Sequence, residues 1–273
     1  MKFLSNVIGL LLLLTFSGFS QAADQSAKKE FPGRDIYLGT EYIEMDAFKD
    51  QFDKVIVVDV RSIYEFETLR IKGAKNIPIN SRKFVNDMQE LRDSNKDAKI
   101  VVYCNGKTCM KSYKAASKAK ARGITDVVAF DAGIMDWAKA HPDLAVLLGE
   151  SPIDPSKLIA KSRFKEHLLA PEKFAEMVQK DNVAVLDVRD PIQRMGMGLF
   201  VGTERQANLD DDSINKHIVA SIKNNKTMLI YDEAGKQVRW LMYRLEAAGV
   251  KDYKFMKGGT RSYFKSLKKH LNI

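Results

Sequence analysis

The sequence predicts an α/β fold made of two domains, each a parallel sheet flanked by helices. Three observations lead to this prediction. The chain repeats itself at a nearly constant distance, and each copy alternates short apolar runs with longer amphipathic segments. Its 273 residues are 45% hydrophobic and 29% charged. This length allows two domains with cores of their own, and the composition excludes a disordered or collagen-like chain.

The repeat is clearest at two apolar runs. Val55-Ile56-Val57-Val58-Asp59-Val60-Arg61 recurs 128 residues later as Val183-Ala184-Val185-Leu186-Asp187-Val188-Arg189. The run from Lys99 to Cys104 recurs at the same distance as the run from Thr227 to Asp232. Because these runs are apolar and β-branched throughout, they predict strands that are buried on both faces, at 55–58, 183–186, 100–103 and 227–231.

An amphipathic helix is expected after the second strand of each copy, over 112–122 and 238–248. Gly123 and Gly249 follow these segments, where glycine commonly ends a helix. These glycines lie 126 residues apart, whereas the preceding strands lie 128 apart. The first copy therefore carries two extra residues between Cys104 and Gly123. Strands that alternate with helices in this way predict parallel pairing through crossover connections.

The domain boundaries follow from the repeat and from the composition of the segments around it. Residues 1–22 read as a signal peptide, with Lys2, a short apolar run and small residues at the exit. The first domain is expected over 35–148 and the second over 163–273, with a Pro- and Ser-containing linker at 149–162. We therefore expect a periplasmic or secreted protein with no membrane span after cleavage.

Charge and cysteine content exclude several classes of site. The formal charge of +9 is spread along the chain without an arginine-rich block, so nucleic acid is not an expected partner. Two cysteines exclude a disulfide-stapled scaffold and a four-thiolate metal site. The four histidines, His141, His167, His217 and His270, are scattered, so neither a metal nor another cofactor is expected.

Several motifs, in one order, are similar to those of the rhodanese family. Asp59-Val60-Arg61-Ser62 leads to Gly73-Ala74-Lys75-Asn76-Ile77-Pro78, Tyr103-Cys104 follows a buried strand, and Gly133 precedes Trp137. The resemblance extends over both copies and implies two rhodanese-like domains. It also implies a sulfurtransferase, in which Cys104 carries sulfane sulfur as a persulfide from thiosulfate or a polysulfide to a thiol acceptor.

The residues around Cys104 suit this chemistry independently of the resemblance. A loop between a strand end and a helix N-terminus directs backbone N–H groups at a bound anion and favours a thiolate. No histidine base accompanies the cysteine, so the mechanism depends on a preformed thiolate. Together with the catalytic Cys104, we expect substrate contacts from the rest of the loop, namely Asn105, Gly106, Lys107, Thr108, Cys109, Met110, Lys111 and Ser112.

Two features of this loop depart from the family pattern. Lys111-Ser112 stands where an Arg-Ser pair is common, and lysine lacks the planar two-point grip of arginine. The two extra residues could widen the loop for a larger acceptor. A phosphatase with a Cys-x5-Arg loop is disfavoured because Met110 occupies the position of the arginine.

Cys109 leaves three interpretations open. It could form a disulfide with Cys104 that masks the nucleophile, it could resolve a persulfide on Cys104, or it could simply fill space. A different class of function follows from the first interpretation, a non-catalytic redox-sensing or binding module. In the second copy Asp232 replaces the cysteine. A carboxylate cannot carry sulfur and would itself take up the positive field of the loop, so this copy is expected to be non-catalytic.

Overall fold

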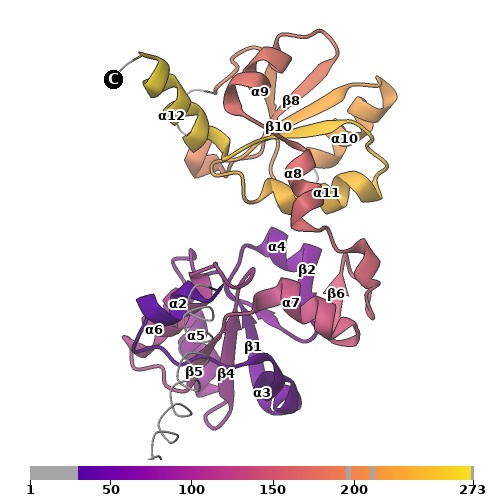
Figure 1. Cartoon of the computed structure of the whole chain (residues 1–273). Coiled ribbons are helices and arrows are strands. Elements are labelled where there is room, and N and C mark those ends of the chain that lie inside the picture. The colour runs from indigo at the N-terminus through magenta and orange to yellow at the C-terminus, as the bar shows by residue number, and fades with distance from the viewer. Residues whose placement is uncertain (1–29, 195–197, 210–212, 272–273) are drawn as a thin grey trace, which may run out of the picture. The chain divides into compact units, whose positions relative to one another are not determined.

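The computed structural model describes residues 30–194, 198–209 and 213–271. The predicted signal peptide at 1–22 lies outside these residues. Their contacts divide the chain into two compact units (Figure 1). Residues 63–69 group with the second unit and 70–146 with the first. None of the described helices combines the length and apolarity that a membrane crossing requires.

The first unit is built on a parallel four-stranded sheet in the order β3-β1-β4-β5. Its strands are β1 (Val55–Asp59), β3 (Lys75–Asn76), β4 (Lys99–Tyr103) and β5 (Val127–Phe130). Its helices are α2 (Pro32–Ile36), α3 (Met45–Asp50), η1 (Phe52–Lys54), α5 (Phe84–Asp93), α6 (Lys111–Lys120), α7 (Gly133–Ala140) and η2 (Pro142–Leu144). The segments α4 (Ile63–Thr68), β2 (Leu69–Ile71) and β6 (Ala145–Leu147) lie at the boundaries of the unit, where β2 pairs with β6.

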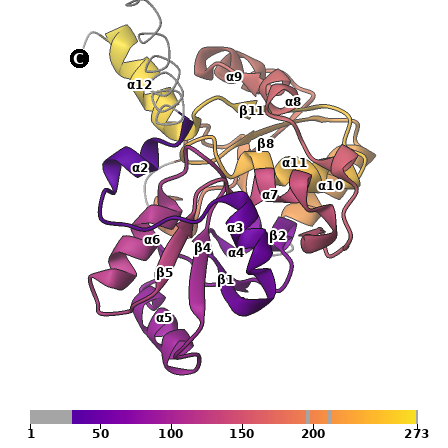
Figure 2. The same cartoon turned by 60° about the horizontal axis from the view of Figure 1, so that its bottom comes forward.

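Helices cover both faces of this sheet, as the fully apolar strands require. Figure 2 shows α5 and α6 on one side of β4 and β5, and α3 on the other. On the first side, Phe84 of α5 and Ala116 of α6 pack in one buried cluster with Ile100 of β4. On the second side, the ring of Phe48 of α3 packs at a tilt of 35° against the ring of Trp137, with the ring centroids 4.4 Å apart.

The second unit holds a parallel five-stranded sheet in the order β7-β11-β10-β8-β9. Its strands are β7 (Leu168–Leu169), β8 (Val183–Asp187), β9 (Glu204–Gln206), β10 (Thr227–Tyr231) and β11 (Tyr253–Met256). Its helices are η3 (Pro155–Lys157), α8 (Lys161–Glu166), α9 (Pro171–Val178), η4 (Pro191–Arg194), α10 (Ser213–Lys223), α11 (Val238–Ala247) and α12 (Gly259–Leu271). Figure 2 shows α9 on one side of β8, and α10 and α11 on the other.

The predicted α/β class with parallel sheets is confirmed, and the two sheets share a common core order. The order β9-β8-β10-β11 repeats β3-β1-β4-β5 at the offset seen in the sequence. Gly123 and Gly249 follow α6 and α11 with φ values of 78° each, so both act as the left-handed residue that ends a helix.

Strand register places the ends of β1 and β4 side by side. Asp59 pairs with Tyr103 in the first sheet, and Asp187 pairs with Tyr231 in the second. The residues that follow each pair, Arg61 and Cys104 in the first unit, therefore emerge at the same carboxyl edge of the sheet. Ligand sites of open parallel sheets lie at this edge.

Candidate functional site

The candidate site is the loop that joins β4 to α6. It begins at Cys104, directly after the strand, and ends where α6 starts at Lys111. The backbone N–H of Ile134 in α7 donates to the carbonyl of Cys104 over 3.0 Å, which fixes the start of the loop. The backbone N–H of Cys109 donates to the carbonyl of Gly106 over 2.7 Å. The second of these bonds folds the segment into a tight turn that brings Cys109 back toward Cys104.

Close packing of two backbone segments requires a glycine at position 133. Gly133 begins α7 with φ of 67°, and a Cβ placed there would lie 2.4 Å from the backbone nitrogen of Gly106. Such a distance is far below van der Waals contact, so a side chain at position 133 would displace the loop. Gly259 of the second unit has the corresponding φ of 59°, and its Cβ would lie 2.3 Å from the carbonyl oxygen of Asp232.

Cys104 lies in the protein core. Its side chain is 0% exposed and belongs to the apolar cluster that includes Val58 and Phe84. Its Sγ lies 3.1 Å from the carbonyl oxygen of Cys109 and 3.6 Å from Oγ of Ser112, both within hydrogen-bond range of a thiol. Burial raises the pKa of Cys104 well above the usual value for a thiol, and the neighbouring Cys109 adds to this effect. The neutral thiol is therefore the stable form at Cys104.

Cys109 has the opposite character. It is partly exposed, and it packs against the same apolar cluster. A hydrogen bond with the Cys104 thiol lowers the pKa of Cys109 to about 6, assisted by the backbone N–H groups of Lys111 and Asn105 and by the Lys111 charge. The amide of Lys111 belongs to the first residue of α6, where a helix end favours negative charge. Both cysteines are free thiols.

An ion pair beneath the loop holds Asn105. Asp59 and Arg61 are both 0% exposed, and the guanidinium grips the carboxylate through Nε at 2.9 Å and Nη2 at 2.5 Å. The remaining nitrogen, Nη1, donates to Oδ1 of Asn105 over 3.1 Å. Asn76 donates through Nδ2 to the carbonyls of Asp59 and Arg61, which joins β3 to the same network. The network therefore positions the first half of the loop.

The other predicted contact residues are spread over different environments. Lys107 is paired with Glu30 and, over 3.5 Å, with Asp136, so its charge is balanced by acids. Thr108 is exposed, Gly106 and Met110 are partly exposed, and Ser112 is buried beside Cys104. Of the predicted set, the structure brings Asn105, Cys109, Lys111 and Ser112 around the two sulfurs.

Reasoning from the sequence did not assign roles to several of these supporting residues. Besides Asp59, Arg61 and Asn76, a second network joins α2 to the sheet. Nε of Arg34 donates to Asp131 over 2.8 Å, and the Tyr113 hydroxyl donates to the same carboxylate over 2.6 Å. The recurrence of Asp-x-Arg at 187–189 was the signal that could have marked the first ion pair.

In the second unit, the corresponding loop contains a carboxylate in place of the cysteine. Asp232 is 4% exposed and accepts five backbone N–H groups, from Ala234, Gly235, Lys236, Gln237 and Val238. As expected from the sequence, the carboxylate itself takes up the donors of this loop. The loop is therefore occupied by an internal anion.

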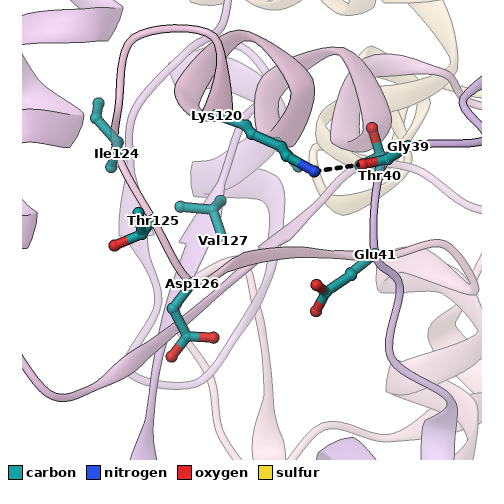
Figure 3. A pocket seen from close by; sticks show the side chains of 9 residues that line it. Gly39, Thr40, Glu41, Lys120, Ile124, Thr125, Asp126 and Val127 are labelled. Atoms are coloured by element: carbon teal, nitrogen blue, oxygen red, sulfur yellow. Dashed lines mark hydrogen bonds between the residues drawn. The ribbon is translucent and has the colours of Figure 1, made fainter.

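A metal site and a surface pocket are two other kinds of site that the described part of the chain could offer. No group of three or more His, Cys, Asp and Glu side chains there could hold a metal ion. A pocket lined by Gly39, Glu41, Lys120 and Asp126 lies beside the start of β5 (Figure 3). Because parallel strands run in one direction, this pocket and the carboxyl end of β4 lie at opposite edges of the sheet.

Comparison with known proteins finds a family match over the segment that contains this loop. The model of the family described as "Rhodanese-like domain" matches residues 44–140, a segment that contains the whole loop. Residues 44–140 are thus similar to a rhodanese-like domain, and this segment contains both cysteines.

Curated proteins that match this chain are longer than the matched segment. The probable adenylyltransferase/sulfurtransferase MoeZ of Mycobacterium tuberculosis is 32% identical over 104 residues, which are 38% of this chain and 25% of the relative. The tRNA uridine(34) hydroxylase of Listeria welshimeri is 27% identical over 193 residues, 69% of this chain and 52% of the relative. The chain thus spans only part of each relative.

Two solved structures align with this chain at low identity and low TM-score. The thiosulfate sulfurtransferase from Pseudomonas aeruginosa aligns over 90% of this chain and 68% of its own, with 12% identity and a TM-score of 0.32. The BH2092 protein from Bacillus halodurans aligns over 54% of this chain and 98% of its own, with 22% identity and a TM-score of 0.36.

Proposed function

We propose that the protein is a sulfurtransferase that carries sulfane sulfur as a cysteine persulfide in the loop 104–112. The observation that carries the proposal is the pair of free thiols, Cys104 and Cys109, held together at the carboxyl edge of a rhodanese-like sheet. Thiosulfate or a polysulfide would be the donor, and a thiol the acceptor. The resemblance to the family points to Cys104, at the strand end, as the carrier.

The proposed chemistry needs a thiolate and a positive environment, and the loop favours a thiolate at Cys109. The helix N-terminus at Lys111 and the Lys111 ammonium favour an anion beside the sulfurs. For Cys104 to take sulfur, its thiol must leave its contact with the Cys109 carbonyl, because the side chain is fully buried as the loop stands.

The second unit would be a non-catalytic copy of the first. Its loop is occupied by the Asp232 carboxylate, which cannot accept sulfur and repels an anionic donor. We further propose that the protein is exported and acts in the periplasm or outside the cell, on the basis of the N-terminal sequence.

The experiment is a mass measurement on the reduced full chain after incubation with thiosulfate. A gain of one sulfur atom in the peptide that contains residues 104–112 is expected. The double variant with Cys104→Ser and Cys109→Ser should gain none. If the reduced wild-type protein takes up no sulfur from thiosulfate or from polysulfide, the sulfurtransferase assignment is wrong.

A second candidate function is supported by the closeness of the two thiols. A redox-sensing or binding module would cycle between two thiols and a Cys104–Cys109 disulfide without carrying sulfur. Under this alternative the isolated protein would lose two hydrogens on mild oxidation and regain them with a reductant, while thiosulfate would leave its mass unchanged.

A further inference from the structure

The two cysteines of the loop differ in solvent exposure and in hydrogen-bond partners, and both properties influence which thiol reacts. Cys104 is 0% exposed and surrounded by apolar side chains, whereas Cys109 is partly exposed at the edge of the same cluster. A donor such as thiosulfate carries two negative charges and cannot enter an apolar core without a large desolvation penalty. Access alone therefore favours Cys109.

Hydrogen bonding favours the same residue. Cys104 lies against the Cys109 carbonyl oxygen at 3.1 Å, an acceptor that stabilises a protonated thiol and repels a thiolate. The Cys109 sulfur instead meets the backbone N–H groups of Asn105 and Lys111 and the Cys104 thiol, whose one proton it shares with the Cys109 carbonyl. The Lys111 amide opens a ten-residue helix, which adds the positive end of its dipole.

The second unit supplies an internal comparison. There the residue at the strand end, Asp232, sits at the centre of its loop and collects five backbone donors. The loop of the first unit, 104–110, is one residue longer than the loop 232–237 of the second, and its turn places Cys109 near the strand end, with Cys109 N–H bonded to the Gly106 carbonyl. In the first unit the residue that meets backbone donors is therefore Cys109, whereas in the second it is the strand-end residue.

We infer that Cys109 is the nucleophile of the loop and that Cys104 is a positioning residue that keeps its proton. This inference rests on the proposed sulfurtransferase function and assigns its first step to a different thiol from the one that the family position suggests. Lys107 forms ion pairs with Glu30 and Asp136. The charge that lowers the pKa of Cys109 is that of Lys111.

The reaction balances without a further reagent. The Cys109 thiolate attacks the outer sulfur of thiosulfate, a new S–S bond forms, and the original S–S bond breaks. Sulfite leaves with the electron pair, and the persulfide on Cys109 keeps one negative charge. An acceptor thiolate then attacks the outer sulfur of this persulfide, which releases the Cys109 thiolate and yields the acceptor persulfide. The Cys104 proton stays in place throughout.

The test locates the sulfur and measures thiol reactivity separately. Reduced full-length protein is exposed briefly to thiosulfate, alkylated, digested and analysed by mass spectrometry. Sulfur is expected on Cys109. Cys109→Ser should lower loading at least about a hundredfold, the loss expected when a covalent nucleophile is removed. In Cys104→Ser, which keeps a hydrogen-bond donor, the sulfur that is taken up is expected on Cys109, whatever the rate of loading.

Cys104→Ala separates a positioning role from a merely structural one. Loss of the donor should move the pH profile of Cys109 alkylation to higher pH, and Cys104→Ser should restore it. Sulfur found on Cys104, or wild-type loading in Cys109→Ser, would overturn the inference and leave the sulfurtransferase function intact. Selective alkylation of Cys109 without sulfur uptake would support Cys109 as the nucleophile and reject the sulfurtransferase function.

Discussion

Arg61 donates through Nη1 to Oδ1 of Asn105 over 3.1 Å while its other nitrogens grip Asp59. One buried guanidinium thus ties the end of β1 to the loop that contains both thiols. In the second unit Arg189 grips Asp187 in the same way, but its Nη1 donates to the carbonyl of Gln193 instead. The ion pair is common to both units, whereas the link to the loop belongs to the first.

This difference predicts that Arg61→Lys and Arg189→Lys will have similar effects on stability and different effects on sulfur uptake. Lysine cannot reproduce the two-point contact of a guanidinium with a carboxylate. Each variant should therefore lose about 2 kcal/mol of unfolding free energy, typical of hydrogen bonds to a charged group. Only Arg61→Lys releases Asn105, so only this variant should load sulfur more slowly, by about tenfold. Denaturant titration and timed mass analysis measure the two effects.

The same pair of arginine variants can contradict a role for Arg61 in sulfur uptake. Equal loading rates in Arg61→Lys and Arg189→Lys would mean that Asn105 does not need its arginine partner. The loop would then be held by the turn between Gly106 and Cys109 alone.

Thiol reactivity should depend on pH through Cys109. Since the hydrogen bond from Cys104 and the nearby donors lower the pKa of Cys109 to about 6, its thiolate forms as the pH rises through about 6. Alkylation by iodoacetamide should therefore rise tenfold per pH unit below 6 and level off above it. Cys104, whose pKa is raised by burial, should stay unmodified in the folded protein at neutral pH. Peptide mass analysis at a series of pH values distinguishes the two sites.

A midpoint near 8.5, the value of an ordinary thiol, would show that the loop does not stabilise the Cys109 thiolate. The variant Lys111→Gln provides a control. Because the Lys111 charge contributes to the lowered pKa of Cys109, its removal should move the midpoint to higher pH without changing the final rate.

The sequence was sufficient for the strands β1, β4, β8 and β10 and insufficient for the other strands and for the loop. Apolar β-branched runs such as 55–58 identified these strands because a strand buried on both faces has apolar side chains at successive positions. Gly123 marked a helix end because few residues other than glycine adopt a positive φ there. Spacing alone also placed Cys104 and Cys109 near each other. It could not decide which sulfur faces the core, because this depends on how the backbone of the loop 104–110 folds around the two side chains.

Removing the internal anion of the second unit should create an anion site. In Asp232→Ala, five backbone N–H groups lose their acceptor, and unsatisfied buried donors cost about 1–3 kcal/mol each unless the loop rearranges. The variant should melt earlier than the wild type and should be stabilised by millimolar sulfate more than the wild type is. Thermal melts with and without sulfate, compared with chloride at equal ionic strength, provide the measurement.

Specific rescue by sulfate would identify the loop as an anion cradle, and loading of the first unit should remain at the wild-type rate. An equal response of both proteins to the two salts would mean that the loop collapses once Asp232 is gone.

Gly133 offers the sharpest test of the contact between α7 and the loop. Gly133→Ala combines a φ of 67° with a Cβ that would lie 2.4 Å from Gly106 nitrogen, so the loop must shift. Gly123→Ala is the matched control, because its φ of 78° imposes similar backbone strain and its Cβ would meet nothing within 4 Å. Each variant should lose about 1 kcal/mol from strain, but Gly133→Ala should lose several times more and should also lose Cys109 reactivity. If both variants alkylate and load sulfur like the wild type, the close packing against Gly106 does not hold the thiols in place.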